Sequence, residues 1–280
     1  MNKLKSVFIT FYILSLICGV FVGVFQFLVE PSEVKFLAGL LVNLLPLIYF
    51  AILYLKKPSK VGGLITIITA LVSTTFLIGL GRTLFETQGI SVIFVLSSLS
   101  IVGWILYLLW YSKFGNRALQ ELVGKNLTDL TFYNEKSEKV AIVSDQYDFH
   151  ILLFHRGNWC PFCMAQVRDI ANHYKKLSSR NVKVHIISPV NESWNLKLAN
   201  KYDIDFDFLR DKNLSISKRL GIVDYNGIPF GFKVLGFESD TILPTVMLLG
   251  KDMKVLRVHE TDDYKKRPEP EFFIRLIDSY

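Results

Sequence analysis

Four long uncharged runs dominate the amino-terminal part of this 280-residue chain. They cover residues 7–29, 36–55, 61–80 and 90–110, and none of them contains Asp, Glu, Lys, Arg or His. A helix that crosses a bilayer core about 30 Å thick needs about 20 apolar residues, and the helices of water-soluble cores rarely sustain such runs. The sequence therefore predicts an all-α transmembrane domain of four helices within residues 1–110.

The composition agrees with a membrane protein and argues against a nucleic-acid partner. Hydrophobic residues make up 51% of the chain and charged residues only 20%, whereas soluble domains have roughly 25% charged residues. Of the formal net charge of +7, most lies in residues 1–117, beside the apolar runs and not on a folded basic face. The lack of ionisable side chains within the runs also disfavours ion transport.

Basic residues in the short connections predict the orientation of the four spans. One side of the membrane would hold eight of them and the other side two: Lys3, Lys5, Lys56, Lys57, Lys60, Lys113, Arg117 and Lys125 against Lys35 and Arg82. Because cytoplasmic loops carry an excess of Lys and Arg, we expect both termini and everything after residue 110 in the cytoplasm of a multi-pass membrane protein. The first run is too long for a usual signal peptide and lacks a small-residue cleavage site, so it is expected to remain.

The first run carries a pair of glycines and one cysteine. Gly19 and Gly23 form a Gly-x-x-x-Gly pair, which indicates either ordinary membrane-helix composition or a close helix contact, within the chain or between subunits. Cys18 is interpreted as a small packing residue, since a thiol in an apolar setting is unreactive.

The sequence pattern predicts one α/β domain over residues 122–280, joined to the helices by a linker at 111–121. A strand at 151–154, a helix at 164–177 and a strand at 182–190 are typical of a parallel sheet flanked by helices. Further elements are expected as helices at 192–202 and 214–220, a strand at 206–209, a hairpin of strands 245–249 and 254–259, and a helix after Pro268 with a buried stripe of Phe272, Phe273, Leu276 and Ile277.

The residues that can carry chemistry lie in the motif Trp159-Cys160-Pro161-Phe162-Cys163, where the first of these strands ends and a helix begins. At a helix amino terminus, unpaired N–H groups and the helix dipole favour a thiolate at Cys160. A spacing of three residues brings Cys163 within reach of a disulfide. We therefore expect Cys160 to be exposed and nucleophilic, and Cys163 to lie one turn further in as the resolving thiol.

Metal and haem sites fit this motif poorly. Zinc needs about four ligands, and the domain offers no third cysteine. Its histidines are too scattered to form a recognisable ligand pair: His150, His155, His173, His185 and His259. Haem attachment requires His directly after the second cysteine, where Met164 stands. The motif predicts a redox dithiol with no metal and no bound organic cofactor.

Several neighbours of the motif are secondary candidates. Arg156 and His155 alternate on a strand, so at most one should face the thiols, and we favour Arg156 as a positive charge that stabilises the thiolate. Trp159 is interpreted as a packing plate, with partner contact as the alternative. The acidic residues at 203–211 are interpreted as a solvent face and not as cation ligands, and the basic cluster at 264–267 as a solvated turn and not as a contact for anionic headgroups.

The motif resembles the peroxiredoxin-like branch of the alkyl hydroperoxide reductase and thiol-specific antioxidant (redoxin) family. The resemblance rests on Arg156-Gly157-x-Trp159-Cys160-Pro161-Phe162-Cys163 after a hydrophobic strand, on Leu243-Pro244-Thr245 before another strand, and on the tail Tyr264 to Pro270. It covers roughly residues 119–280 and implies a thioredoxin-like fold. It further implies that Pro244 is cis and that Pro244 and Thr245 form a loop against Cys160.

Two positions depart from the pattern of the relatives. Typical peroxiredoxins place Thr or Ser three residues before the nucleophilic cysteine, and this chain has Gly157 there. Ordinary thioredoxins carry a buried Asp six residues before the first cysteine, and this chain has Phe154. The first departure argues against peroxidase activity, and the second removes the usual internal base for the second thiol.

Together these features predict a membrane-anchored thiol-disulfide oxidoreductase that reduces peroxides through a Cys160–Cys163 disulfide. Two alternatives stay open: a thioredoxin-like protein disulfide reductase, and a non-enzymatic redox-sensing domain that binds a partner at the membrane. The expected partners are a peroxide or disulfide substrate, an external thiol reductant such as a thioredoxin system, and the lipid bilayer.

Overall fold

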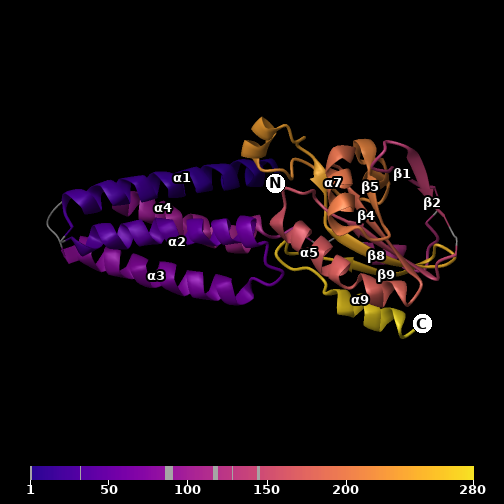
Figure 1. Ribbon diagram of the computed structural model, residues 1–280. Coiled ribbons are helices and arrows are strands. Elements are labelled where there is room, and N and C mark those ends of the chain that lie inside the picture. The colour runs from indigo at the N-terminus through magenta and orange to yellow at the C-terminus, as the bar shows by residue number, and fades with distance from the viewer. Residues whose placement is uncertain (1, 32, 86–90, 116–118, 128, 144–145) are drawn as a thin grey trace. The chain divides into compact units, whose positions relative to one another are not determined.

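The computed structural model describes residues 2–31, 33–85, 91–115, 119–127, 129–143 and 146–280 (Figure 1). The predicted start of the fourth span at residue 90 and residues 116–118 of the predicted linker, Arg117 included, lie outside the described residues. Contacts divide the chain into two units. One holds Met1–Lys113 together with Ile228–Phe237, and the other holds Phe114–Gly227 and Glu238–Tyr280. The assignment of Ile228–Phe237 to the first unit differs from the predicted domain boundaries.

The first unit is built on four long apolar helices. Their bounds are α1 (Asn2–Val29), α2 (Val34–Lys56), α3 (Gly62–Phe85) and α4 (Val92–Leu106), the last extended by a π-helical turn, Tyr107–Tyr111. With that turn included, all four are long and apolar enough to cross a membrane, with a mean hydropathy of 2.1 to 2.5 over their best window. The four-helix apolar region expected from the sequence is therefore present.

Small residues allow the helices of the first unit to approach closely. A Cβ atom on Gly19 would lie 2.3 Å from the Asn43 side chain, and one on Gly23 would lie 2.9 Å from the Leu40 Cα atom. The Gly-x-x-x-Gly pair therefore makes a close contact between α1 and α2 within the chain. The packing role expected for Cys18 is wrong, because Gly19 occupies the inward face and Cys18 is exposed.

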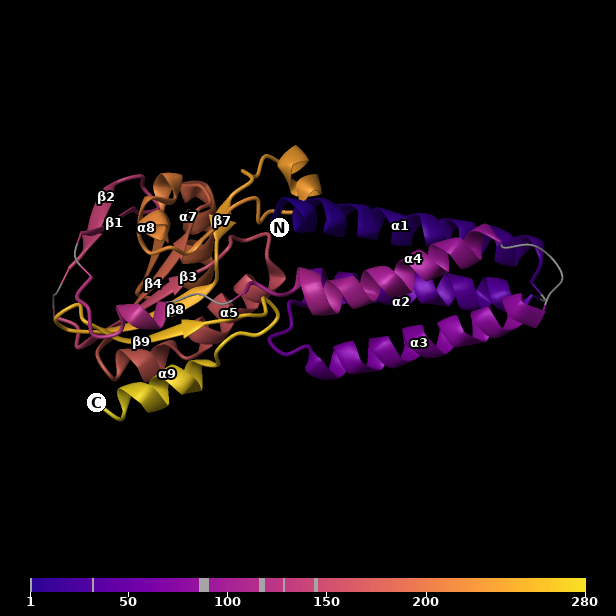
Figure 2. The same cartoon turned by 180° about the vertical axis from the view of Figure 1, so that it is seen from behind.

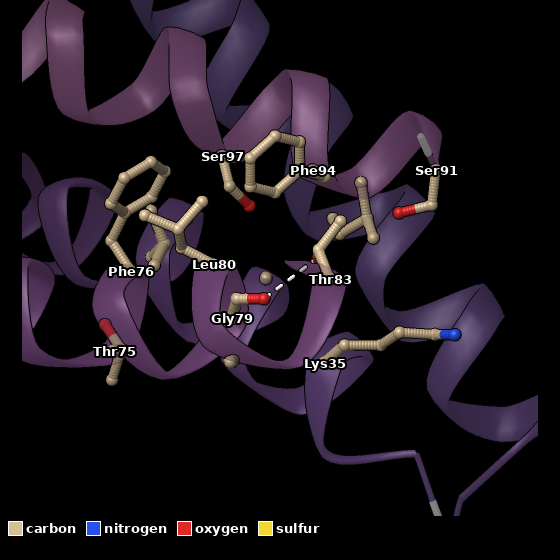
Figure 3. Close-up of a pocket in the computed structure, with 13 residues that line it drawn as sticks. Lys35, Thr75, Phe76, Gly79, Leu80, Thr83, Ser91, Phe94 and Ser97 are labelled. Atoms are coloured by element: carbon tan, nitrogen blue, oxygen red, sulfur yellow. Dashed lines mark hydrogen bonds between the residues drawn. The ribbon is translucent and has the colours of Figure 1, made fainter. Parts of the chain in front are cut away.

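Aromatic and polar side chains fill the interior of the helical unit. The hydroxyl oxygens of Tyr49 and Tyr107 lie 3.1 Å apart, and Trp104 Nε1 donates to Thr69 Oγ1 at 2.9 Å. A small cavity lies between α2, α3 and α4, with Ser97, Phe94 and Gly79 on its wall (Figure 3). It offers about 10 Å³ to a water-sized molecule, roughly one water. This space is too small for an organic ligand.

The second unit is built on a seven-stranded mixed sheet with the order β2-β1-β5-β4-β3-β8-β9. The strand bounds are β1 (Leu130–Tyr133), β2 (Lys139–Ile142), β3 (Phe149–Phe154), β4 (Val182–Ser188), β5 (Phe206–Arg210), β8 (Thr245–Gly250) and β9 (Val255–Glu260). Strands β3, β4 and β5 are parallel, whereas β8 and β9 are antiparallel to their neighbours. The central strands β3 and β8 are almost entirely buried.

Helices cover both faces of this sheet. Their bounds are α5 (Pro161–Asn172), α6 (Tyr174–Ser178), α7 (Glu192–Tyr202), α8 (Ser215–Arg219) and α9 (Pro270–Ile277). Helices α5 and α9 lie on one face, where His173 Nε2 is 2.6 Å from Glu271 Oε1, and α7 lies on the other (Figures 1 and 2). This mixed sheet with flanking helices is the thioredoxin-like architecture expected from the sequence.

Some details differ from the predicted elements. The helix expected at 164–177 breaks at His173 into α5 and α6. The buried stripe of α9 includes Ile274, while Phe272 and Leu276 are half-buried. The hairpin of β1 and β2 and the short ribbon of β6 (Val223–Asp224) with β7 (Thr241–Ile242) were not predicted. Strands of two residues carry no periodicity from which a sequence could reveal them.

Candidate redox site

The first cysteine of the motif lies at the junction of β3 and α5. Cys160 is the residue that caps the helix, with φ −88° and ψ 113°, and Pro161 is the first helical residue. The Cys160 carbonyl accepts the N–H of Met164 at 3.1 Å, which begins the helical hydrogen bonding. Proline suits this position because the N–H groups of the first turn have no acceptor within the helix, and proline has no N–H to leave unpaired. Of the N–H groups in this first turn, that of Cys163 bonds to the Cys160 sulfur and helps to lower its pKa.

Both thiols of the motif are reduced and buried. Cys160 is 1% exposed and Cys163 is 0% exposed. The expectation that Cys160 is exposed is therefore wrong. The segment after β9 folds back against the motif: the Tyr264 ring lies 5.3 Å from the Phe162 ring, and Arg267 Nη2 lies 4.0 Å from Cys163 Sγ.

The two thiols differ sharply in acidity. Burial alone raises the pKa of Cys160, but a hydrogen bond from Cys163 and the charges of Arg267 and Arg156 outweigh it and lower that pKa to about 6. The pKa of Cys163 is raised by burial and by its proximity to the Cys160 sulfur. These opposite shifts favour a thiolate at Cys160 and a thiol at Cys163 at neutral pH, and the nucleophilic and resolving roles of the two cysteines stay predictions.

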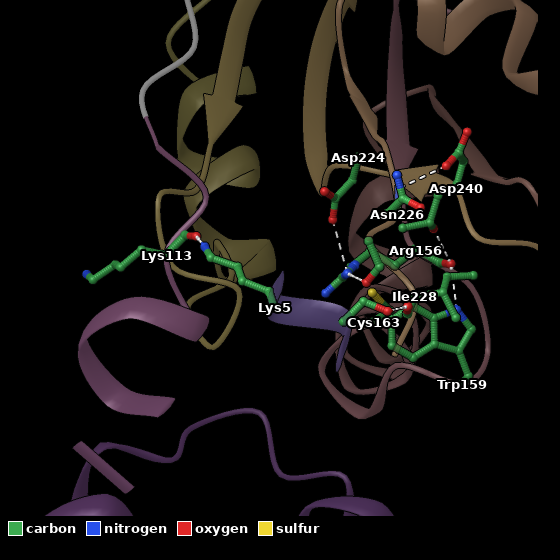
Figure 4. Close-up of polar contacts among 12 residues, drawn as sticks. Lys5, Lys113, Arg156, Trp159, Cys163, Asp224, Asn226, Ile228 and Asp240 are labelled. Atoms are coloured by element: carbon green, nitrogen blue, oxygen red, sulfur yellow. Dashed lines mark hydrogen bonds and ion pairs between the residues drawn. The ribbon is translucent and has the colours of Figure 1, made fainter. Parts of the chain in front are cut away.

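Arg156 is buried and bound on several sides. Its Nη2 atom lies 3.1 Å from Asp224 Oδ2 and donates to the Gly227 carbonyl oxygen (Figure 4). The guanidinium carbon also lies 4.8 Å from the centre of the Trp159 ring. Its charge is therefore largely balanced by an acid, although it still helps to lower the pKa of Cys160. Asp224 and Gly227 had no signal in the sequence.

Trp159 is a buried plate beside this arginine. Its Nε1 atom donates to the Arg156 carbonyl oxygen at 3.0 Å, and its ring faces the Arg156 guanidinium. A guanidinium over an indole face gains a cation–π attraction in addition to packing. The observed placement is that of a packing residue.

His155 is buried as well, and the expectation that at most one of these two residues faces the thiols stays a prediction. Its Nδ1 atom accepts the Gly157 N–H at 3.1 Å, and its side chain is fully buried. Burial, the larger cause, and the charge of Arg267 together lower the pKa of His155 to about 4. His155 is therefore neutral at neutral pH and serves as a hydrogen-bond acceptor for the turn.

Gly157 takes a conformation that explains the missing Thr or Ser of typical peroxiredoxins. Its φ is +122°, a value that side chains rarely adopt. A Cβ atom there would also lie 2.9 Å from Val190 Cγ1. The turn therefore has no room for the side chain that typical peroxiredoxins carry at this position.

Pro244 and Thr245 lie where β7 runs into β8. Thr245 pairs with Phe154, the last residue of β3, and both Pro244 and Thr245 are buried. No cis peptide bond occurs in the described part of the chain, so Pro244 is trans and the expected cis geometry is wrong. A contact of this loop with Cys160 stays a prediction.

Arg267 is the residue that sequence reasoning placed wrongly. The cluster at 264–267 is not a solvated turn: Tyr264 and Lys265 are buried, and Arg267 is half-buried beside the thiols. Lys265 Nζ lies 3.0 Å from Asp263 Oδ1, which fixes the segment. Among the described residues, Arg267 has no carboxylate partner.

Two other groups of candidate ligands lie elsewhere in the α/β unit. His150 and His185 stack on adjacent strands, with Nδ1 and Nε2 3.1 Å apart, so the histidines are less scattered than expected. Asp207 accepts from His185 at 2.7 Å, and Asp211 is buried and accepts the Ile216 and Ser217 N–H groups, which corrects its interpretation as a solvent-facing residue. Within the described ranges, no group of three or more His, Cys, Asp or Glu is arranged to hold a metal ion.

The second unit thus has a thioredoxin-like fold in which two cysteines lie at the start of a helix that follows a central strand. Residues 123–258 match the model of the AhpC/TSA family. This match confirms the family resemblance seen in the motif, and it includes both cysteines but ends before Arg267. No curated protein is similar enough to the chain to be matched.

Several solved structures are similar to the same part of the chain. A peroxiredoxin-like protein from Aquifex aeolicus shares 10% identity, with a TM-score of 0.46, over 56% of this chain and 86% of its own. Peroxidoxin BcpB from Mycobacterium tuberculosis shares 14% identity, with a TM-score of 0.46, over 56% of this chain and 96% of its own. AhpC from Enterococcus faecalis shares 16% identity, with a TM-score of 0.45, over 56% of this chain and 91% of its own.

Proposed function

We propose that the chain is a membrane-anchored thiol peroxidase in which Cys160 attacks the peroxide and Cys163 resolves the product. The observation that carries this proposal is the acidity of Cys160, whose pKa is lowered to about 6 at the start of α5 although the side chain is buried. A thiolate, and not a thiol, is the nucleophile in such chemistry. The family match supports thiol-dependent peroxidase or oxidoreductase activity in general.

The reaction follows from the protonation states of the two sulfurs. The Cys160 thiolate attacks one peroxide oxygen, so an S–O bond forms, the O–O bond breaks, and the departing alkoxide takes a proton to leave as an alcohol or water. The Cys163 sulfur then attacks the sulfenic sulfur of Cys160, which releases water and forms the disulfide. An external dithiol reduces this disulfide and is itself oxidised.

The burial of both thiols favours a small substrate over a protein disulfide. A folded protein would have to bring its own disulfide sulfur to a Cys160 side chain that is 1% exposed. A peroxide needs to insert only two oxygen atoms beside the sulfur. The Arg267 guanidinium near Cys163 then supplies a positive charge for the alkoxide that leaves.

Serine variants of the three cysteines test this proposal on the full chain in nanodiscs. Cys160→Ser should lower peroxide consumption by at least about 10³-fold, because the nucleophile is lost. Cys163→Ser should accumulate a sulfenic acid at Cys160, which dimedone labels for mass spectrometry. Cys18→Ser, in helix α1, should retain full activity.

Three outcomes of this experiment would contradict the proposal. Equal activity of the Cys160 and Cys163 variants would remove the assigned roles. Turnover of an oxidised peptide disulfide without turnover of hydrogen peroxide would support a disulfide reductase instead. Reversible oxidation without turnover of either substrate would support a redox sensor.

The proposal includes anchoring by the four helices with both termini in the cytoplasm. The excess of Lys at the ends Lys3–Lys5 and Lys56–Lys60 supports this orientation. A reducing compartment also supplies the external dithiol that the cycle needs. Green fluorescent protein fused after Tyr280 should fluoresce in cells, and a dark fusion with active alkaline phosphatase at the same place would show the opposite orientation.

A further inference from the structure

Residues 228–237 form a strap that packs with the helical unit, although the chain on both sides of it belongs to the α/β unit. Ser6 Oγ donates to the Ile228 carbonyl oxygen at 2.5 Å, and the Gly231 N–H donates to Thr10 Oγ1 at 3.0 Å. The strap therefore lies along the first turns of α1.

The strap also contacts helix α2. The Phe232 ring lies 6.3 Å from the Tyr54 ring in the last turns of that helix. Within the strap, the Phe232 ring also lies 6.0 Å from the Phe237 ring. The strap thus meets the ends of two helices that are apolar enough to cross a membrane.

The composition of the strap does not suit a surface loop in water. Its sequence, Ile-Pro-Phe-Gly-Phe-Lys-Val-Leu-Gly-Phe, holds a single charged residue. Phe230 is 50% exposed and Leu235 is 69% exposed. Exposed loops are normally polar, and neighbouring apolar side chains left uncovered indicate a surface that something else covers.

The position of the strap along the helices indicates what covers it. Ser6 and Thr10 follow Lys3 and Lys5 at the start of an apolar run, and Tyr54 precedes Lys56 at the end of another. Lysines and aromatic rings gather where a membrane helix leaves the acyl chains and enters the headgroups. On α1 itself, Leu4 and Phe11 are exposed beside the strap contacts, as expected of side chains that face lipid.

The base of the strap is tied to the candidate redox site. Strands β6 and β7 pair across the base, and the Asn226 N–H donates to Asp240 Oδ1 at 2.8 Å (Figure 4). Arg156 donates to the Gly227 carbonyl oxygen on one side of the base, and Thr241 Oγ1 donates to the Arg156 carbonyl oxygen at 2.7 Å on the other. Because Gly227 is bonded directly to Ile228, any restraint on the strap acts on the turn that binds Arg156.

We propose that the strap inserts its apolar side chains into the interfacial region of the lipid bilayer and so anchors the ribbon that holds Arg156. The occupant of the exposed strap face is lipid at the level of the headgroups and upper acyl chains. Phe230 and Leu235 supply the buried apolar area, in the manner of an interfacial amphipathic segment.

A tryptophan probe on the strap tests this proposal. Leu235→Trp in the full chain is reconstituted into vesicles of phosphatidylcholine brominated at different depths, and its emission is compared with that of the parent protein. We expect the added emission to be blue-shifted, and to be quenched more by bromines near the glycerol backbone than by bromines near the chain ends. Val140→Trp, on the exposed edge strand β2, serves as the matched control in water and should not be quenched.

Two results would overturn the proposal. Emission at 235 that matches the control, red-shifted and unquenched, would show that the strap lies in water. Blue-shifted emission without quenching by any brominated lipid would show that protein, such as a second copy of the chain, covers the strap. Neither readout depends on the thiols, so the result is independent of the proposed peroxidase activity.

Discussion

Two segments of the α/β unit bring an arginine to the same pair of thiols, and they balance its charge differently. At the end of β3, Arg156 is almost fully buried, faces Asp224 at 3.1 Å and stacks on Trp159. In the segment after β9, Arg267 is half-buried and, among the described residues, has no acid partner. One arginine is held within a neutral pair, while the other presents a net charge to the sulfurs.

The difference assigns separate tasks to the two arginines. A buried ion pair stabilises mainly through its geometry, because most of its Coulomb energy offsets the cost of removing both charges from water. An arginine without an acid partner acts at full charge on a nearby thiolate. The charge of Arg267 accordingly lowers the pKa of Cys160 more than that of Arg156 does. We therefore expect Arg156 to act mainly on the stability of the site, and Arg267 mainly on the reactivity of Cys160.

The largest expected effect comes from breaking the neutral pair. Asp224→Asn leaves the Arg156 guanidinium buried and without its acid, so the free energy of unfolding of the α/β unit should fall by about 3–5 kcal/mol. The same change leaves the full Arg156 charge near Cys160, so the thiolate should not become less reactive. Hydrogen exchange of the β3 amides measures the first effect, and alkylation of Cys160 by iodoacetamide measures the second.

An exposed ion pair supplies the control for this variant. Asp278 pairs with Arg180 at 2.6 Å on the surface. Asp278→Asn should change amide protection far less, because solvent screens exposed pairs. If Asp224→Asn slowed alkylation while leaving stability unchanged, the division of tasks between the two arginines would be reversed.

The sequence predicted the part of the site that depends on local order. An apolar strand followed by Cys160, Pro161 and a helical pattern was enough to place the first cysteine at a helix start, where the structure has it. The four membrane-crossing helices were equally accessible, because their length and lack of charge are local properties. Local signals thus identified the fold class and the two thiols.

The remainder of the site depends on contacts between distant residues. Arg267 and Cys163 are 104 positions apart, and only the return of the chain after β9 brings them together. Asp224 lies on a two-residue strand that has no periodic pattern. His150 and His185 meet because β3 and β4 are neighbours, which spacing along the chain does not reveal. The contacts of the motif with the segment beyond residue 260 were missed for the same reason, since Tyr264 and Arg267 are far from Phe162 and Cys163 along the chain.

A smaller effect is expected from removing the charge of Arg267, the arginine that has no acid partner among the described residues. Arg267→Gln should raise the pKa of Cys160 from its value of about 6, because a cause of the lowering is lost. Below that pKa the sulfur is protonated and unreactive, so alkylation in the parent protein should rise through about pH 6 and then level off. In the variant this rise should move to higher pH, which slows alkylation at pH 6 to 7 by about tenfold, or about 1.4 kcal/mol.

The neighbouring residue offers a matched control for the lost charge. Lys266 is exposed, and Lys266→Gln removes one positive charge from the same segment without touching the thiols. Its alkylation profile should follow that of the parent protein, because solvent screens the exposed charge. At pH 9 the alkylation rates of the Arg267→Gln variant and the parent protein should converge, since Cys160 is then ionised in both proteins. A profile for Arg267→Gln that coincides with that of Lys266→Gln would mean that Arg267 does not activate Cys160, and Arg156 would then have to supply the charge despite its pairing with Asp224.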